Sequence, residues 1–116
     1  MKIYGIKSCD TMKKAFAWLE GNRIPYEFHD YKKDGVPPGK LRAWARQVGW
    51  ERLANTRGPT WRKIPDKQKV NLDEAKALAL LEQYSSAIKR PILETGSTLL
   101  VGFSREEYAA KVSRFS

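Results

Sequence analysis

One residue in the sequence is suited to thiol chemistry. Cys9 lies in the segment KSCDTMKK (7–14), beside three lysines and the hydroxyls of Ser8 and Thr11, which could donate to its sulfur. The thiolate is the reactive form, and nearby positive charge favours it. We therefore expect the pKa of Cys9 to lie below the value of about 8.5 for a free cysteine. The alternative is an inert, buried packing residue, because free cysteines are often buried.

The spacing around Cys9 restricts the chemistry. Met12 stands three residues after it, where a C-x-x-C motif has the cysteine that resolves a mixed disulfide. A reactive Cys9 would therefore work as a monothiol and need an external thiol, for which glutathione is the natural candidate. The chain has one cysteine and one histidine, His29, too few for a Cys/His zinc site, so we predict no metal. We interpret His29 as structural.

Composition limits the possible partners. The 116 residues fit one domain and carry a formal net charge of +9, which suggests anionic substrates or acidic partners. The densest basic stretch, 57–69, is interpreted as a solvated face. No apolar run approaches the roughly 20 residues that cross a bilayer, and the N-terminus does not resemble a signal peptide. We expect a cytoplasmic protein with no membrane partner. Without a recognition motif, we do not expect nucleic-acid binding.

The hydrophobic pattern places Cys9 at a junction between two elements. Residues 2–6 alternate as in a strand, and apolar residues at helical spacing then run from Met12 to a stop at Gly21. Either Cys9 or Asp10 is in position to cap this helix. A second strand is predicted over 26–31, so the chain opens as a β-α-β unit. The thiol would then lie beside the unpaired N–H groups and positive dipole of a helix N-terminus.

The middle of the chain is predicted to be helical. Helices are expected over 41–48 and around 50–53. Asn71 and Glu74 form a capping-box pattern that would open a further helix, ending near Tyr84.

The last part of the chain reads as two strands and a helix. Strands are predicted after Pro91 and over 98–103, joined by a tight turn at Gly96. A terminal helix follows, capped by Ser104 and reaching Phe115. The predicted fold is α/β: one domain, 1–116, with a four-stranded mixed sheet (β-α-β … β-β-α) and a helical insert at about 36–84.

Several segments together resemble the ArsC-like family of the thioredoxin superfamily, in its YffB branch, which is related to arsenate reductases and Spx regulators. The resemblance spans nearly the whole chain and implies a thioredoxin-like sheet with a helical insert. The segments that carry it are YGIKSCDTMKKAFAWL (4–19), FHDYKKDGVP (28–37), NTRGPTWRK (55–63), IKRPIL (88–93) and LLVGFSREEY (99–108).

The resemblance implies a set of site residues. The family's reactive thiol falls on Cys9, and the cis-proline that this superfamily places beside its thiol falls on Pro91. Arg90, just before that proline, takes the position of an arginine that binds the anionic substrate. Arg57 is implied as a second anion-facing arginine. We add Thr11 to the substrate- and anion-binding set.

The chain departs from the arsenate-reductase pattern H-x3-C-x3-R, since Gly5 and Lys13 stand at its flanking positions. A third arginine of that pattern is replaced by Gly102 or Phe103. The leading hypothesis is therefore a glutathione-dependent monothiol reductase that uses Cys9. It holds no bound cofactor, takes glutathione as co-substrate and acts on a small anionic or disulfide substrate, or on a protein disulfide. The alternatives are an arsenate reductase with a reduced anion site and a non-catalytic, Spx-like binder of RNA polymerase.

Overall fold

The chain forms two compact units. The computed structural model describes residues 1–37 and 39–112. Its first unit combines residues 1–33 with the chain from Arg90 onward, and its second unit comprises Asp34–Lys89. The second unit includes the helical insert predicted for 36–84. The assignment of the whole chain to one domain stays a prediction.

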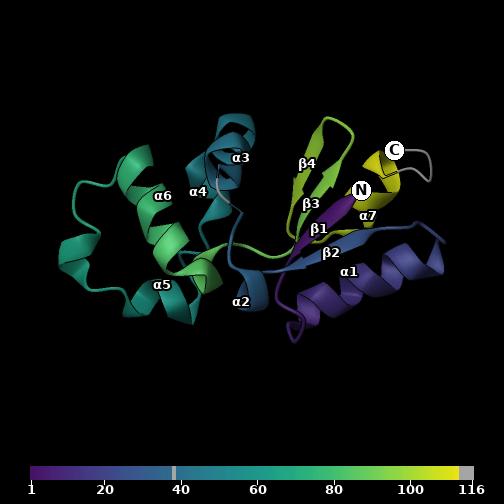
Figure 1. The fold of residues 1–116 in the computed structure, drawn as a ribbon, viewed down its shortest axis with the longest axis horizontal. Helices are drawn as coiled ribbons and strands as arrows, with labels where there is room; N and C mark the ends of the chain where they lie inside the picture. Colours follow the sequence, from purple (N-terminus) through teal and green to yellow (C-terminus); the bar gives the residue numbers. More distant parts are fainter. Residues whose placement is uncertain (38, 113–116) are drawn as a thin grey trace. The chain divides into compact units, whose positions relative to one another are not determined.

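The first unit is built on the predicted four-stranded sheet. Its strands are β1 (Lys2–Gly5), β2 (Glu27–Asp30), β3 (Ile92–Thr95) and β4 (Thr98–Val101), in the order β2-β1-β3-β4. β1 pairs in parallel with β2 and antiparallel with β3, and β3 pairs antiparallel with β4 (Figure 1). The prediction of an α/β fold with a mixed sheet is therefore confirmed.

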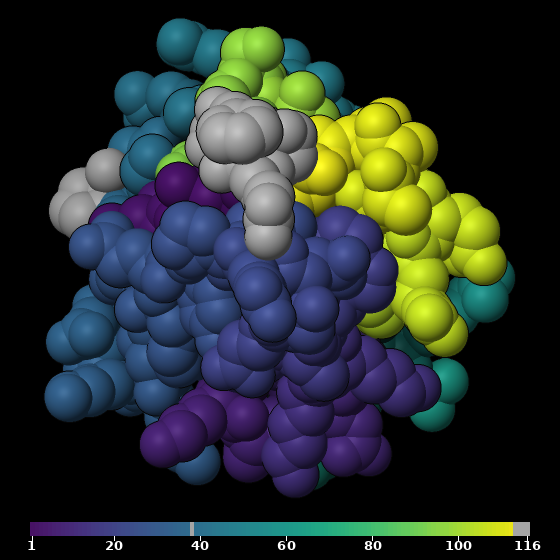
Figure 2. Space-filling model, turned by 90° about the vertical axis from the view of Figure 1, so that its right-hand side faces the viewer, coloured from purple at the N-terminus to yellow at the C-terminus, as the bar shows by residue number. Residues whose placement is uncertain are grey.

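Two helices of this unit pack against a common core. Helix α1 (Asp10–Gly21) connects β1 to β2, and helix α7 (Arg105–Lys111) follows β4. Ser104 caps α7, accepting a hydrogen bond of 3.2 Å from the backbone N–H of Glu107, as the sequence predicts. Figure 2 shows α1, in purple and blue, next to the yellow α7 on one face of the molecule. Their shared core consists of Ile3, Met12, Ala15, Leu19, Ile24, Leu93, Leu100 and Tyr108.

The last residue of β1 allows the strand and α1 to approach closely. Met12 is fully buried, and its side chain lies against the backbone of Gly5. A Cβ atom at position 5 would lie 2.7 Å from Met12 Cε, closer than side-chain atoms pack. The glycine therefore makes room for the methionine. The close packing fixes the first turn of α1 against the end of β1.

We predict that Gly5→Ala lowers the free energy of unfolding by about 1 kcal/mol or more, because the new methyl group overpacks the space that Met12 fills. The measurement is urea denaturation followed by circular dichroism. Gly21→Ala is the matched control, since a Cβ there would meet nothing within 4 Å. That control should be neutral or slightly stabilising. Equal stability of both variants and the parent would contradict the close approach.

The second unit is mainly helical. Its helices are α3 (Lys40–Val48), α4 (Trp50–Leu53), α5 (Pro59–Lys63) and α6 (Glu74–Gln83). The sequence predicts α3, α4 and α6, but not α5. Trp44 and Trp61 are buried in this unit, which agrees with a packing role for these tryptophans. The unit also contains the 3-10 turns Asp66–Gln68 and Ser85–Ala87. Helix α2 (Tyr31–Asp34) spans the boundary in the chain, since its first three residues belong to the first unit.

Two local predictions need correction. The N-cap of α6 is Asp73, whose Oδ1 accepts a 2.8 Å hydrogen bond from the N–H of Lys76. Asn71 instead adopts a left-handed backbone with φ of 53°, a conformation that asparagine tolerates. The predicted strand 26–31 is shorter, because Tyr31 already begins α2. Phe115, predicted in the terminal helix, lies outside the described residues.

Candidate functional site

Cys9 occupies the junction that the sequence predicts. It is the N-cap residue of α1, with an extended backbone (φ −82°, ψ 134°), and its carbonyl accepts a 3.0 Å hydrogen bond from the N–H of Lys13. The side chain is half-buried. Its sulfur is outside the geometry of a capping hydrogen bond, yet the N–H groups of Thr11 and Met12 still favour its anion. Thr11 therefore acts on the sulfur through its backbone.

The segment before β3 brings a cation to the sulfur. The peptide bond between Arg90 and Pro91 is cis, and the Arg90 side chain lies within hydrogen-bonding reach of the thiol. The carbonyl of Pro91 accepts a 2.8 Å hydrogen bond from the N–H of Gly102, which ties this segment to the loop after β4. Three predicted site residues besides Cys9, namely Thr11, Arg90 and Pro91, therefore belong to one unit.

The surroundings of the sulfur shift its ionisation. Burial alone raises the pKa of the Cys9 thiol. Hydrogen bonding from the Met12 backbone, then from the Arg90 side chain and the Thr11 backbone, lowers the pKa, and the charge of Arg90 lowers it further. The stabilising groups outweigh the burial, so the pKa lies below its ordinary value. The thiolate is therefore populated at lower pH than for a free cysteine.

Three further residues that the sequence analysis did not single out lie close to one another, and one of them, Tyr31, lies near Arg90. The Tyr4 hydroxyl donates a 2.8 Å hydrogen bond to Oε1 of Glu94, and burial raises the pKa of this tyrosine. Burial also raises the pKa of Tyr31, whose ring lies 6.4 Å from that of Tyr4, while the charge of Arg90 opposes this rise. Both phenols therefore stay protonated. The sequence signal that could have identified this pair is the alternation of the two strands, which places Tyr4 and Glu94 on the same face of the sheet.

Arg57 belongs to the other unit. It is exposed in the turn before α5, where the N–H of Gly58 donates a 3.1 Å hydrogen bond to the carbonyl of Asn55. Its anion-facing role stays a prediction. His29 lies on β2 with its ring 5.5 Å from that of Tyr4, among aromatic neighbours as expected for a structural histidine.

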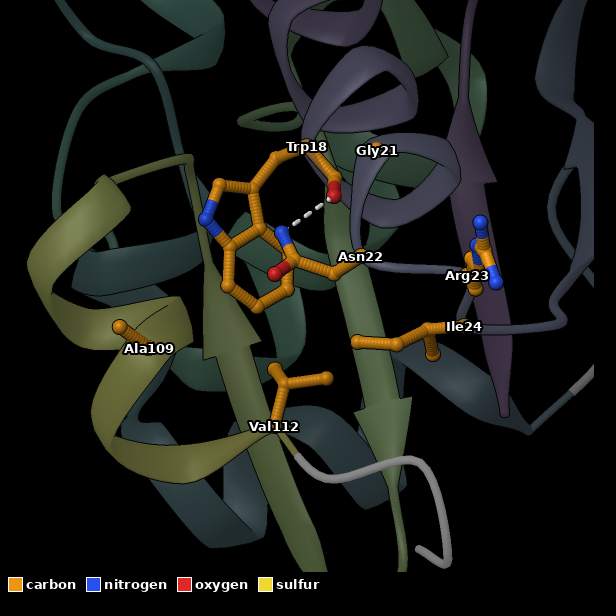
Figure 3. A pocket seen from close by; sticks show the side chains of 7 residues that line it. All are labelled: Trp18, Gly21, Asn22, Arg23, Ile24, Ala109 and Val112. Carbon is orange, nitrogen blue, oxygen red and sulfur yellow. Dashed lines mark hydrogen bonds between the residues drawn. The ribbon is translucent and has the colours of Figure 1, made fainter.

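Two cavities in the first unit flank α1. A cleft of about 680 Å³ is lined by Thr11 and so adjoins the thiol. A second cavity, of about 520 Å³, lies at the far end of the helix, where Trp18, Asn22 and Ile24 face Ala109 and Val112 (Figure 3). The twelve residues of α1 span roughly 18 Å, so the second cavity is remote from Cys9.

The described residues contain neither a candidate metal site nor a candidate membrane-spanning helix. Between residues 1 and 112, leaving out position 38, no group of three or more His, Cys, Asp or Glu side chains is placed to hold a metal ion. Over the same residues, no helix is both long and apolar enough to span a membrane.

The fold and site define a thioredoxin-like protein whose single thiol lies at a helix N-terminus. The ArsC family matches residues 4–111, and the chain belongs to this family. A solved YffB protein is 48% identical, with a TM-score of 0.93 over 97% of this chain and 98% of that one. An arsenate reductase (ArsC) related protein from Brucella melitensis is 47% identical, with a TM-score of 0.74 over 95% and 92% of the two chains.

The chain is also similar to a transcriptional regulator. The global transcriptional regulator Spx of Streptococcus pneumoniae is 28% identical over 110 residues, which cover 92% of this chain and 81% of the regulator. The relatives of the chain therefore include both arsenate reductase-like proteins and Spx regulators.

We predict that Arg90→Gln raises the pKa of Cys9, because the variant loses the positive charge beside the sulfur. The measurement is the pH dependence of thiolate absorbance in the ultraviolet, together with the rate of alkylation by iodoacetamide. The variant's titration curve should move to higher pH. Lys89→Gln removes the same charge from the neighbouring, exposed residue and should leave the curve in place. Equal shifts in both variants would contradict a specific effect of Arg90.

Proposed function

We propose that the protein is a monothiol thiol–disulfide reductase in which Cys9 is the nucleophile and glutathione is the thiol co-substrate. The observation that carries this proposal is the half-buried Cys9 at the N-terminus of α1, whose pKa is lowered by the helix N–H groups and by Arg90. The chain has no second cysteine, so an external thiol must regenerate the site.

The proposed reaction has two exchange steps. The thiolate of Cys9 attacks one sulfur of a substrate disulfide, so that a new S–S bond forms and the old one breaks. The departing sulfur keeps the bonding electron pair and takes up a proton as a free thiol. Glutathione thiolate then attacks the other sulfur of the mixed disulfide, which releases Cys9 as thiolate. Over the cycle the substrate gains a thiol, and glutathione becomes part of a new disulfide.

The charges around the thiol suit an anionic co-substrate. Glutathione carries two carboxylates, and guanidinium groups bind carboxylates through paired hydrogen bonds. Arg90 is the first proposed partner, since it already lies beside the sulfur. Arg57 is the second, and Thr11 contributes its N–H in the first turn of α1. We propose the cytoplasm as the site of action, because glutathione keeps thiols reduced there.

Arsenate reduction is the second candidate, favoured by the arginine beside the thiol and by the printed name of the Brucella melitensis relative. The Cys9 thiolate would form a bond to As(V) and displace a hydroxide, and the hydroxide would take up a proton and leave as water. Glutathione would then attack the Cys9 sulfur, so that arsenic departs with the electron pair as arsenite and Cys9 is left in a mixed disulfide with glutathione. A second glutathione would attack that disulfide and release the Cys9 thiolate. Gly5 and Phe103 provide no charge for the oxyanion, so we rank this reaction second.

We predict that oxidised glutathione forms a mixed disulfide with Cys9 and that added glutathione reverses it. Intact-protein mass spectrometry would show the glutathionyl adduct, and peptide mapping would place it on Cys9. The Cys9→Ser variant should form none. The adduct should form faster as the pH rises through the lowered pKa of Cys9, because the thiolate is the attacking species.

The outcomes separate the candidate functions. Arsenate-dependent oxidation of glutathione that is lost in Cys9→Ser would favour the arsenate reductase. A protein that forms no adduct while its thiol reacts with iodoacetamide would contradict the reductase proposal. In that case a pull-down of RNA polymerase subunits becomes the deciding test of the Spx-like alternative. Charge reversal at Arg62 and Lys63 should then abolish capture, and Cys9→Ser should not.

A further inference from the structure

Two residues that line the cleft of about 680 Å³ are linked to the surroundings of the thiol. Thr11 lines the cleft, and its backbone N–H favours the anion of Cys9. On the other side, Phe103 follows Gly102, whose N–H is bonded to the carbonyl of Pro91. The cleft therefore shares Thr11 with the surroundings of the thiol, and its residue Phe103 directly follows Gly102, which is bonded to the proline beside Arg90. Its lining residues are Thr11, Lys14, Ala17, Trp18, Phe103, Ser104 and Arg105.

The floor of the cleft is apolar and firmly supported. Trp18 and Phe103 are half-buried, so part of each ring stays open to solvent. Both rings pack edge-on against the fully buried Tyr108, with centroid distances of 5.5 Å for Trp18 and 4.7 Å for Phe103. Aromatic pairs of this geometry stabilise each other beyond the area that they bury. The floor is thus a preformed surface for an apolar side chain, and Ala17 adds no polar group to it.

The charged residues that line the cleft are both cations. Lys14 and Arg105 are exposed, and no carboxylate is among the lining residues that the structure describes. The acidic side chains of the first turn of α7 each have a partner, and one of them is bonded to the cleft residue Ser104. Glu106 accepts a 3.1 Å hydrogen bond from the Ser104 hydroxyl, and Glu107 forms an ion pair with Lys111 at 3.8 Å. An occupant of this cleft should therefore combine apolar surface with negative charge.

We propose that the cleft binds a segment of a protein substrate in which acidic residues and a large apolar side chain lie next to the reactive cysteine. This inference rests on the proposed function, since the bound segment would deliver its disulfide to Cys9. Glutathione has the negative charge but no aliphatic or aromatic side chain to cover the rings of Trp18 and Phe103. The cleft volume of about 680 Å³ is within the range of pockets that enclose drug-sized ligands.

The test measures binding without any thiol chemistry. The full chain carrying Cys9→Ser is titrated with a short synthetic peptide that has serine in place of the reactive cysteine, followed by glutamates and a leucine. Isothermal titration calorimetry gives Kd. A second peptide has lysines in place of the glutamates, and a third has serine in place of the leucine. The first peptide should bind about tenfold more tightly than either of the others, a difference of about 1.4 kcal/mol.

Variants of the chain identify the surface that binds. In the Cys9→Ser background, Arg105→Glu and Lys14→Glu should each weaken binding of the acidic peptide several-fold. Lys13→Glu is the matched control, because Lys13 is an exposed neighbour of Lys14 that does not line the cleft. It should leave Kd within twofold. Phe103→Ala should weaken binding about tenfold, and its circular dichroism spectrum checks the fold, since it also removes the contact with Tyr108.

The failure of this inference is distinguishable from the failure of the proposed function. Equal affinity for the three peptides, or a loss of binding in Lys13→Glu as large as in Lys14→Glu, overturns the cleft as a specific site. That result leaves a glutathionyl adduct on Cys9 intact if the reductase proposal is correct. Selective binding without any adduct on the parent protein would retain the cleft and remove the reductase.

Discussion

An anionic sulfur at the first turn of α1 depends on three segments that are far apart in the chain. β1 must end close to the first turn of α1, α1 must begin directly after Cys9, and the segment before β3 must bring Arg90 to the thiol. The first and the third of these conditions each have a visible structural cause. Gly5 lets Met12 pack against the strand end, and the hydrogen bond between Gly102 and Pro91 ties the loop after β4 to the arginine's segment.

The same site balances two opposing requirements. Burial of the sulfur raises the pKa of Cys9, and stabilisation by the helix and Arg90 lowers it. Deeper burial would protect the thiol but disfavour its anion and block attack on a substrate. Full exposure would leave the helix N–H groups competing with water for the sulfur. The half-buried position keeps enough access for exchange while the stabilising groups still dominate, which is what a thiolate nucleophile needs.

Local sequence patterns predict the elements better than the site. The strand-to-helix junction at Cys9 follows from a change of periodicity, and the hairpin at Gly96 follows from its turn residue. No local pattern places Arg90 beside Cys9, because the order of the strands in the sheet makes that contact. The sequence analysis could therefore expect it only from the family resemblance. The N-cap of α6 was misassigned to Asn71 because Glu74 completes a capping-box pattern with it, whereas the true cap, Asp73, is followed three residues later by Lys76. The position of Arg57 relative to the thiol depends on how two units pack, which periodicity does not encode.

The loop after β4 bears on the choice between an inorganic oxyanion and an organic substrate. A small oxyanion is held best when charges reach it from several sides. Gly102, with φ of 80°, has no side chain, and its N–H is already bonded to Pro91. Phe103 packs its ring against Tyr108 and turns the neighbouring surface apolar. The loop therefore has apolar surface at the position where an oxyanion site would need a third cation. For this reason the loop supports the proposed exchange with a sulfur carried by an organic molecule over the reduction of free arsenate.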